Sequence, residues 1–251
     1  MEWQLHICLE YMNEQWNYYK YQMYLNFKDL STINYKEAWD YQEKLFLDTV
    51  SLKVEMRNHS DYQKNMQHYL LFCEHPHVYT LGNSGEYSNL LISDEFLKKI
   101  NASFYKTNRG GDITYHGPGQ IVGYPIFDLE ALKIGIKDYI HLLEESIINF
   151  LKSIGIPSER LHGTTGVWID TKGKNTRKIC AIGVRASRYV TMHGFALNVN
   201  TNLDYFTYIN PCGFIDKGVT SIEKELSCKQ NIDEIKELLL FEIKKIFLVN
   251  E

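Results

Sequence analysis

Residues 166–199 read GVWIDTKGKNTRKICAIGVRASRYVTMHGFALNV, and this stretch decides the fold class of the chain. It contains three apolar runs, at residues 166–170, 178–185 and 190–199, which are separated by polar loops. Short apolar runs that are bounded by turn residues are typical of β-strands. The stretch therefore predicts three strands that are joined by polar loops.

Helical patterns bracket this strand-rich centre. Apolar residues at three- and four-residue spacing predict helices from residue 35 to about residue 54, from 131 to 151 and from 232 to 247. Two further apolar stretches, residues 69–81 and 121–129, are expected to be strands. Strands between helices are typical of the α+β class. We therefore expect an α+β fold, a mainly antiparallel sheet with flanking helices on one side of it.

The composition is that of a globular chain. Apolar residues make up 44% and charged residues 23% of the 251 residues, and no linker-like stretch divides them. We expect a single domain over residues 1–251, with residues 1–26 as an N-terminal extension of unknown role. No apolar run approaches the ~20 residues of a bilayer-spanning helix, and the N-terminus lacks the pattern of a signal peptide. We therefore expect a cytoplasmic protein.

The charge and the cysteines disfavour several other classes of protein. A net charge of −4 disfavours a general nucleic-acid binder, which is more often basic. The cysteines are Cys8, Cys73, Cys180, Cys212 and Cys228. An odd number of cysteines without C-x-x-C spacing disfavours a disulfide framework or a zinc site. We therefore expect no bound metal.

The most unusual stretch is residues 109–120, RGGDITYHGPGQ, where glycines lie among polar side chains such as Arg109 and His116. A backbone without Cβ atoms allows a ligand to approach the main chain closely, so this density favours a ligand-binding loop over a structural turn. No Walker A motif is present, because the Gly173-Lys174 pair is followed by asparagine. The loop also precedes strand-like sequence, so it does not fit a dinucleotide-binding turn.

Two further positions carry reactive groups. Cys212 lies between Pro211 and Gly213, which are typical of a turn, and a thiol in a turn can reach a substrate. Lys178 opens the apolar run at residues 178–185, and a nearby cation stabilises a thiolate. Taken alone, an inert loop cysteine and a strand-end lysine that reaches solvent are the plainer interpretations of these positions.

Taken together, the motifs resemble the lipoyl(octanoyl) transferase family. The matching segments, in the family's order, are residues 74–82, 109–120, 166–168, 178–183, 193–198 and 210–213. The agreement of many separated segments over residues 35–223 is specific, whereas any one of them alone would be weak.

The resemblance implies a fold similar to that of the catalytic domains of biotin and lipoate protein ligases. It also implies that Cys212 carries an acyl group as a thioester and that Lys178 lowers the pKa of its thiol. The segments that correspond to the acyl-binding site are Arg109, Gly110, Gly111, Asp112, Ile113, Thr114, Tyr115 and His116, then Ala181, Ile182 and Gly183, then Gly194, Phe195 and Ala196.

The implied enzyme is an acyltransferase that moves an octanoyl group from octanoyl-acyl carrier protein to a lysine of lipoyl domains, the first step of protein lipoylation. The acceptors of this family are the lipoyl domains of 2-oxoacid dehydrogenases and the glycine cleavage H protein. No cofactor, nucleic acid or membrane partner is expected. Two alternatives remain open, an ATP-dependent lipoate or biotin protein ligase on the same fold and a non-catalytic carrier-binding module. A requirement for ATP would indicate the ligase, and a thiol without high reactivity would indicate the binding module.

Position 180 departs from the family, which usually has a small residue such as alanine there. Cys180 thus adds a second thiol near Lys178, and on a regular strand the two side chains would share one face with Cα atoms about 7 Å apart. We nevertheless choose Cys212 as the nucleophile. The apolar neighbours of Cys180 indicate burial and a raised pKa.

Overall fold

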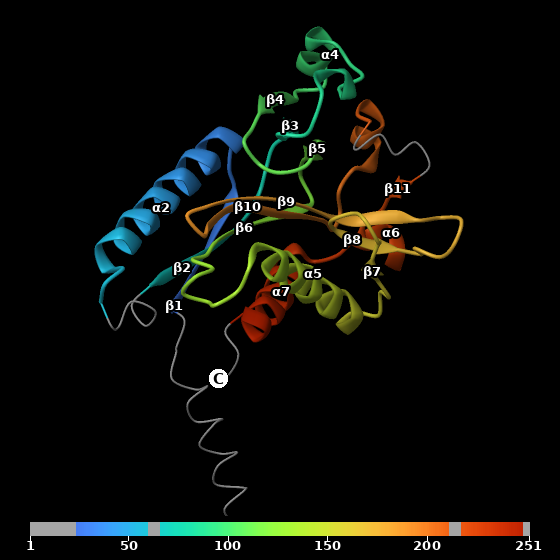
Figure 1. Cartoon of the computed structure of the whole chain (residues 1–251). Helices are drawn as coiled ribbons and strands as arrows, with labels where there is room; N and C mark the ends of the chain where they lie inside the picture. The colour runs from blue at the N-terminus through green and yellow to red at the C-terminus, as the bar shows by residue number, and fades with distance from the viewer. Residues whose placement is uncertain (1–23, 60–65, 211–216, 248–251) are drawn as a thin grey trace, which may run out of the picture.

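A computed structural model describes residues 24–59, 66–210 and 217–247 of the chain. An eight-stranded sheet forms the centre, with the strand order β1-β2-β6-β10-β9-β8-β7 and with β11 paired to β9 off this path (Figure 1). Its strands are β1 (Tyr24–Thr32), β2 (Gln67–Glu74), β6 (Gln120–Ile126), β7 (Glu159–Arg160), β8 (Val167–Ile169), β9 (Arg177–Ser187), β10 (Val190–Asn198) and β11 (Gly218–Val219). Only the β1–β2 and β11–β9 ladders among these are parallel, so the expected α+β class with a mainly antiparallel sheet is confirmed.

Helices cover both faces of the large sheet (Figure 1). They are α2 (Tyr35–Met56) on one face, and α5 (Ile136–Ser153) and α7 (Ile232–Phe247) on the other, with the short α6 (Ile222–Leu226) between β11 and α7 in the chain. Leu70 and Phe72 of β2 pack in the α5/α7 core, whereas Leu71 and Cys73 pack in the α2 core. The expectation that the helices lie on one side is therefore wrong, because successive side chains of a strand point to opposite faces and both faces are apolar here.

A small second sheet stands on the α2 side of the large one. Its strands are β3 (Val78–Leu81), β4 (Ser103–Lys106) and β5 (Ile113–His116), in the order β4-β3-β5, and α4 (Asp94–Lys99) precedes β4. The single strand expected at residues 69–81 is in fact two strands, β2 and β3, which belong to different sheets. Pro76 lies between them, and proline cannot donate a ladder hydrogen bond.

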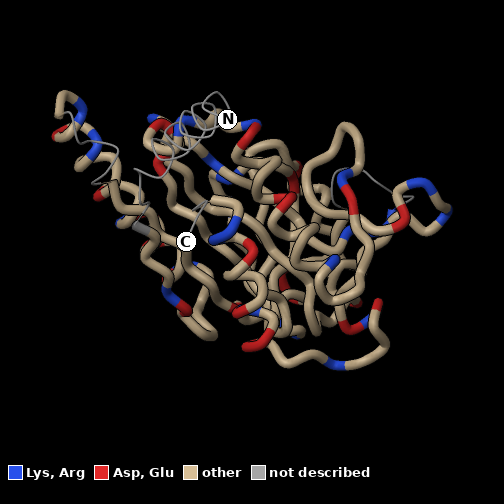
Figure 2. Tube along the Cα trace, turned by 90° about the horizontal axis from the view of Figure 1, so that it is seen from below, with Lys and Arg blue, Asp and Glu red and all other residues tan. Residues whose placement is uncertain are grey.

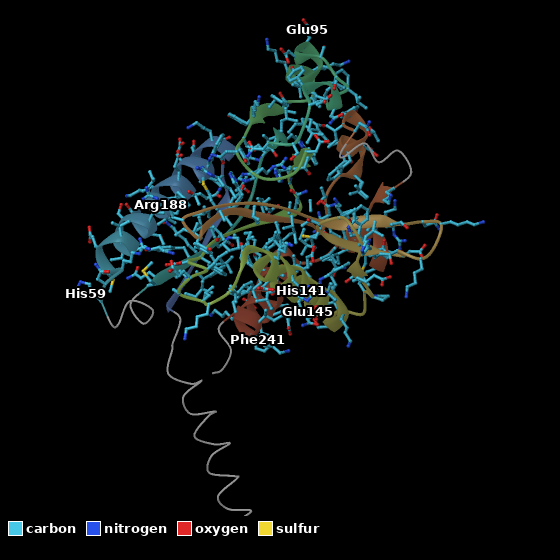
Figure 3. All side chains as sticks on the ribbon, in the orientation of Figure 1. His59, Glu95, His141, Glu145, Arg188 and Phe241 are labelled. Carbon is cyan, nitrogen blue, oxygen red and sulfur yellow. The ribbon has the colours of Figure 1, made fainter. Side chains whose placement is uncertain are left out.

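The strands expected at residues 166–199 are confirmed as β8, β9 and β10, and α7 has the expected bounds. Helix α5 begins later than expected, at Ile136, because residues 129–133 form turns and Gly135 caps the helix. Its end agrees with the expected stop signal, since Gly155 follows with a φ of +82°. Figure 3 shows side chains filling the space between the large sheet and these helices.

The expected N-terminal extension is described only in part. Residues 24–26 belong to β1 and pair with residues 67–69 of β2, whereas residues 1–23 lie outside the described part of the chain. In the part of the chain that the structure describes, no helix combines the length and the apolar character needed to cross a membrane.

Candidate active site

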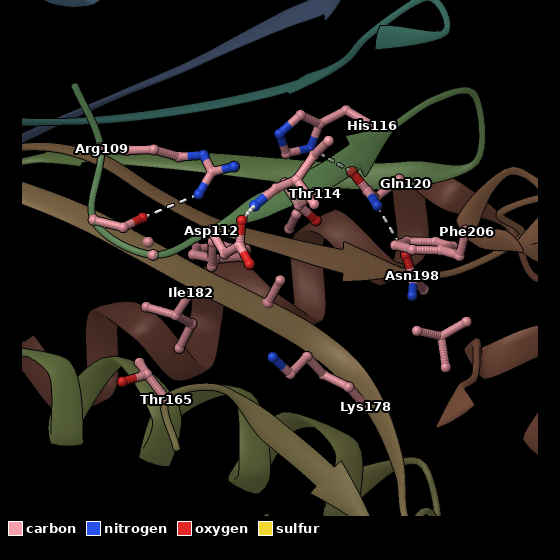
Figure 4. Close-up of a pocket in the computed structure, with 18 of the residues that line it drawn as sticks. Arg109, Asp112, Thr114, His116, Gln120, Thr165, Lys178, Ile182, Asn198 and Phe206 are labelled. Carbon is pink, nitrogen blue, oxygen red and sulfur yellow. Dashed lines mark hydrogen bonds between the residues drawn. The ribbon is translucent and has the colours of Figure 1, made fainter. Parts of the chain in front are cut away.

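A cavity of about 630 Å³ lies between the small sheet, the large sheet and the segment at residues 203–210. It gathers most of the residues that the sequence predicted as a site. Those that line it are Arg109, Gly110, Gly111, Asp112, Ile113, Thr114 and His116, then Lys178, Ala181, Ile182 and Gly183, then Gly194, Phe195 and Ala196. Three segments that are distant in sequence therefore share one cavity, which Figure 4 shows in close-up.

Tyr115 is not among the residues that line this cavity. Its side chain is fully buried, its ring stacks on Tyr205 with centroids 4.9 Å apart, and its hydroxyl lies 2.7 Å from His77 Nδ1. Thr114 and His116 line the cavity while Tyr115, which lies between them on β5, points the other way. Ile113 packs in the same core cluster as Tyr115 and still lines the cavity at the start of β5.

The glycine loop at residues 109–112 lies directly on the edge of β9. Gly110 N donates to Val184 O at 2.9 Å, beyond the point where β9 stops pairing with β8. A Cβ atom on Gly183 would lie 2.7 Å from Gly110 O, which is closer than real Cβ contacts. The glycines that predicted ligand contact thus also allow two backbones to pack closely.

We expect Gly183→Ala to displace the glycine loop from β9 and to lower the rate of the acyl transfer that the family resemblance implies roughly 10–100-fold, because small displacements at a reaction centre are costly. The comparison is the initial rate of the variant and of the wild type, with thermal unfolding to confirm that both are folded. Gly135→Ala is the matched control, since its added methyl group would meet only the Asp138 carboxylate at 3.3 Å. Wild-type rates in Gly183→Ala would show that the loop tolerates displacement.

Lys178 is held between two strands beside this cavity. It pairs with Trp168 of β8 on one side and with Val219 of β11 on the other. Its Nζ lies 4.6 Å from the centroid of the Trp168 ring, which is a favourable cation–π distance, and its backbone oxygen accepts from Thr220 N at 2.9 Å. Figure 4 shows the amine extending toward the side of the cavity where Ile182 and Thr165 lie. The lysine is thus positioned by its main chain and by its side chain.

Cys212, with Pro211 and Gly213, lies outside the described residues. The nearest described residues on either side are Asn210 and Lys217, and both line the cavity. The described residues on both sides of Cys212 therefore lie at the cavity wall.

Cys180, the second thiol near Lys178, is fully buried in the α5/α7 core. Burial raises its pKa, as the sequence predicted. A bulge separates it from Lys178, since Trp168 pairs with Lys178 but the adjacent Val167 pairs with Cys180. The strict alternation on which the expected shared face depended does not hold across this bulge.

A chain of hydrogen bonds crosses the polar wall of the cavity. His116 Nδ1 lies 2.8 Å from Gln120 Oε1, and Gln120 Nε2 donates to Asn198 Oδ1 at 2.8 Å (Figure 4). Asn198 Nδ2 then donates to the backbone oxygen of Thr220 at 2.9 Å, which links β5, β6 and β10 to the residue after β11. Gln120 and Asn198 were not predicted as site residues, although both lie within the segments that carry the family resemblance.

The histidines of this wall are neutral at pH 7. Burial lowers the pKa of His116 to about 3, with the neighbouring His75 as a second cause, and it lowers the pKa of His193 to about 3, helped by Arg109. Arg109 itself donates to the backbone and hydroxyl oxygens of Thr80, at 2.5 and 2.9 Å. Arg109 therefore supplies positive charge to a wall whose imidazoles carry none.

A further wall is formed by the segment at residues 203–210, which contributes Leu203, Phe206, Thr207, Ile209 and Asn210. Among these, only Asn210 belongs to a segment that carries the family resemblance, and the others, which include part of a 3-10 turn, η2 (Leu203–Tyr208), were not predicted as site residues. Tyr35 at the start of α2 also lines the cavity without a sequence signal. Within the described residues, no group of three or more His, Cys, Asp or Glu side chains is placed to hold a metal ion.

Comparisons with known proteins agree with this geometry. The chain matches the family model of the lipoyl protein ligase A/B catalytic domain over residues 34–244. An octanoyltransferase of Christiangramia forsetii is 55% identical over 221 residues, which cover 88% of this chain and 94% of that protein. An octanoyltransferase of Bacteroides fragilis is 53% identical over 211 residues, with 84% and 92% covered.

Solved structures share the fold at low sequence identity. A bi-partite lipoate protein ligase from Thermoplasma acidophilum has a TM-score of 0.63 at 16% identity, covering 89% of this chain and 84% of that one. A lipoate-protein ligase A bound with ATP has a TM-score of 0.60 at 15% identity, covering 90% and 85%. These similarities concern the fold alone, and they confirm the expected likeness to lipoate protein ligases.

Proposed function

The chain belongs to the lipoyl protein ligase A/B catalytic domain family, and from this membership we propose that its cavity transfers an octanoyl group from a carrier-bound thioester to a lysine of a lipoyl domain. The observation that carries the proposal is the convergence of Lys178, the glycine loop and both described ends of the Cys212 segment on one cavity. An ATP-dependent ligase on the same fold is the less supported reading, because the relatives at 51–55% identity are octanoyltransferases.

The cavity suits a medium-length acyl chain. Its volume of about 630 Å³ is within the range of small-ligand pockets, and apolar side chains such as Ile140, Ile182 and Phe195 contribute to its walls. Burial of an apolar chain against such walls is favourable by roughly 25 cal/mol per Å². Lys178, which lines the same cavity, would face the thioester.

The proposed reaction has two steps. The Cys212 thiolate attacks the carbonyl carbon of the donor thioester, so that a new C–S bond forms and the bond to the carrier sulfur breaks. The acceptor lysine then attacks the enzyme thioester through its amine, which forms a C–N bond and releases the Cys212 thiolate. The first step exchanges one thioester for another, and the second forms a more stable amide, so the transfer needs no ATP. Covalent catalysis divides one difficult transfer into two easier steps.

Lys178 would move the protons of both steps. As an ammonium group it stabilises the Cys212 thiolate and gives its proton to the departing carrier thiolate, which leaves as the thiol. As a neutral amine it then accepts a proton from the attacking lysine, as a general base. After the second step the thiolate and the ammonium group are both restored, so the protons balance over one turnover.

The test of this function is intact mass spectrometry of the enzyme after incubation with octanoyl-acyl carrier protein. We expect an octanoyl adduct that forms without ATP and disappears when a lipoyl domain is added. A reaction that requires ATP and leaves no adduct on the enzyme would support the ligase alternative instead.

A basic loop beside the cavity would receive the carrier protein. Lys172 and Lys174 lie exposed in the loop between β8 and β9, whose blue tip is at the right-hand edge of Figure 2. Lys174 also lines a second cavity of about 580 Å³, which shares Gly218 and Val219 with the first. Positive charge beside an active site increases the rate of encounter with an acidic partner.

We expect Lys172→Glu/Lys174→Glu to raise the apparent KM for octanoyl-acyl carrier protein and to flatten its dependence on salt, because repulsion replaces steering. Initial rates over a range of carrier and salt concentrations measure both effects. Lys98→Glu/Lys99→Glu, which reverses two exposed charges on α4, is the matched control. Kinetics of the loop variant that match those of this control would exclude the loop as a docking site.

A further inference from the structure

The segment at residues 89–91, which joins η1 (Tyr87–Asn89) to the region before α4, lies between two walls of the cavity. On one side it contacts the glycine loop. Asn89 Nδ2 donates to both carboxylate oxygens of Asp112, at 2.9 and 2.8 Å, and Asp112 lines the cavity. The Asp112 Oδ1 atom also accepts from Ile113 N at 2.6 Å, so the carboxylate is fixed to its own loop as well.

The main chain of the same segment holds the opposite wall. Asn89 O accepts from Asn210 N at 2.8 Å, and Leu91 N donates to Tyr208 O at 2.9 Å. Between these two hydrogen bonds, Leu90 forms an antiparallel bridge with Ile209, and both side chains are buried. This pairing joins the segment at residues 203–210 to the connection between β3 and α4, next to the direct contacts that Tyr79 and Tyr115 of the small sheet make with Tyr205.

The Asp112 carboxylate has little room to move away from Asn89. A Cβ atom on Gly85 would lie 2.4 Å from Asp112 Oδ1, so the carboxylate packs directly on the backbone at Gly85. Asp112 is also 9% exposed, and a buried carboxylate is costly unless hydrogen bonds satisfy it. One residue, Asn89, thus satisfies this carboxylate with its side chain and holds Asn210 with its backbone.

We propose that Asn89 is a positioning residue that sets the spacing between the glycine loop and the segment at residues 203–210 during acyl transfer. The inference rests on the proposed function, because the glycine loop would present the acyl group and Asn210 is the last described residue before Cys212 in the sequence. Asn89 acts through Asp112 and Asn210, and it contributes no charge to the cavity. Its loss should therefore lower the turnover of bound donor more than it weakens donor binding.

Asn89→Asp tests the proposal with almost no change in size. It places a second carboxylate against Asp112, so repulsion should part the two walls. We expect the rate of acyl-enzyme formation at saturating donor to fall roughly 10–100-fold, with a smaller change in KM. The reactivity of the enzyme's thiols toward iodoacetamide should stay near that of the wild type, because Lys178 is untouched.

The reciprocal exchange Asn89→Asp/Asp112→Asn restores an amide–carboxylate pair in the opposite direction and should recover the rate to within a few-fold of the wild type. Asn202→Asp makes the same change of charge next to η2 and is the matched control, since its side-chain oxygen can still accept from Asp204 N. The proposal would be overturned if the double variant did not recover the rate of acyl-enzyme formation that Asn89→Asp loses. A wild-type rate of acyl-enzyme formation in Asn89→Asp itself would also overturn it.

Hydrogen exchange at residues 203–210 measures the same contact without any substrate. We expect hydrogen exchange to be faster in Asn89→Asp, to return to the wild-type rate in the double variant Asn89→Asp/Asp112→Asn, and to be unchanged in Asn202→Asp. A wild-type rate of hydrogen exchange at residues 203–210 in Asn89→Asp would overturn the positioning role. Absence of any acyl adduct on the wild-type enzyme would instead contradict the proposed function, and hydrogen exchange would still decide whether Asn89 joins the two walls.

Discussion

Cys212→Ala is expected to abolish both the acyl adduct and turnover, a fall of roughly 10³-fold or more, whereas Cys180→Ala should leave most activity. The reason is that the two thiols differ in their expected access to the donor thioester. The segment that contains Cys212 starts and ends at cavity-lining residues, while Cys180 is fully buried and burial raises its pKa. Intact mass spectrometry after incubation with octanoyl-acyl carrier protein measures the adduct, and steady-state rates measure turnover.

The matched control is Cys228→Ala, which removes an exposed thiol outside the cavity wall. It should leave the adduct and the rate unchanged. An adduct that persists in Cys212→Ala but disappears in Cys180→Ala would reverse the assignment of the nucleophile. In that case the resemblance to the family would no longer identify the reactive thiol.

Lys178→Ala should lower the rate roughly 10²–10⁴-fold and raise the apparent pKa of the reactive thiol. A cation favours the thiolate, so its removal moves the pKa toward the ordinary cysteine value of about 8.5. At pH 7 a smaller fraction of the thiol is then ionised, and activity should recover only in part as the pH rises. The rate of iodoacetamide labelling as a function of pH measures the shift directly.

Lys178→Arg separates the two roles of the lysine. Arginine keeps the positive charge, so thiol labelling should remain fast, but it cannot accept a proton near neutral pH and amide formation should be slow. Lys172→Ala, on the adjacent loop, is the control for loss of a surface lysine. Identical labelling profiles for the wild type and Lys178→Ala would exclude Lys178 as the group that activates the thiol.

The sequence predicted elements well where apolar periodicity was long and uninterrupted. Strand β10 and helix α7 follow from their patterns, because β10 is buried along its whole length and α7 buries one apolar face. The small sheet was missed because β4 and β5 are short and mix polar with apolar residues, and because β3 was merged with β2 into one expected strand. The position of the helices was wrong because an apolar run in a strand does not reveal that its two faces meet different helices.

The residues of the candidate site also differ in whether the sequence alone could predict them. The glycine loop, Lys178 and the glycine segments of β9 and β10 were predictable, since their unusual residues lie close together in sequence and resemble a known family. Asn89 and the wall at residues 203–210 were not predictable, because their roles depend on contacts between positions that are distant along the chain. The placement of Tyr115 required the register of β5, which only the structure provides.

The position of Lys178 between β8 and β11 also bears on how the enzyme is made. Ribosomes release a chain from its N-terminus, so β8, β9 and β10 emerge before residues 218–220. Until then, Asn198 has no Thr220 carbonyl to bind, and Lys178 has a neighbouring strand on one side only. An incomplete chain therefore lacks one of the two strands that flank Lys178, the proposed catalytic lysine. Release of β11 and Thr220 supplies that strand and the carbonyl that Asn198 binds.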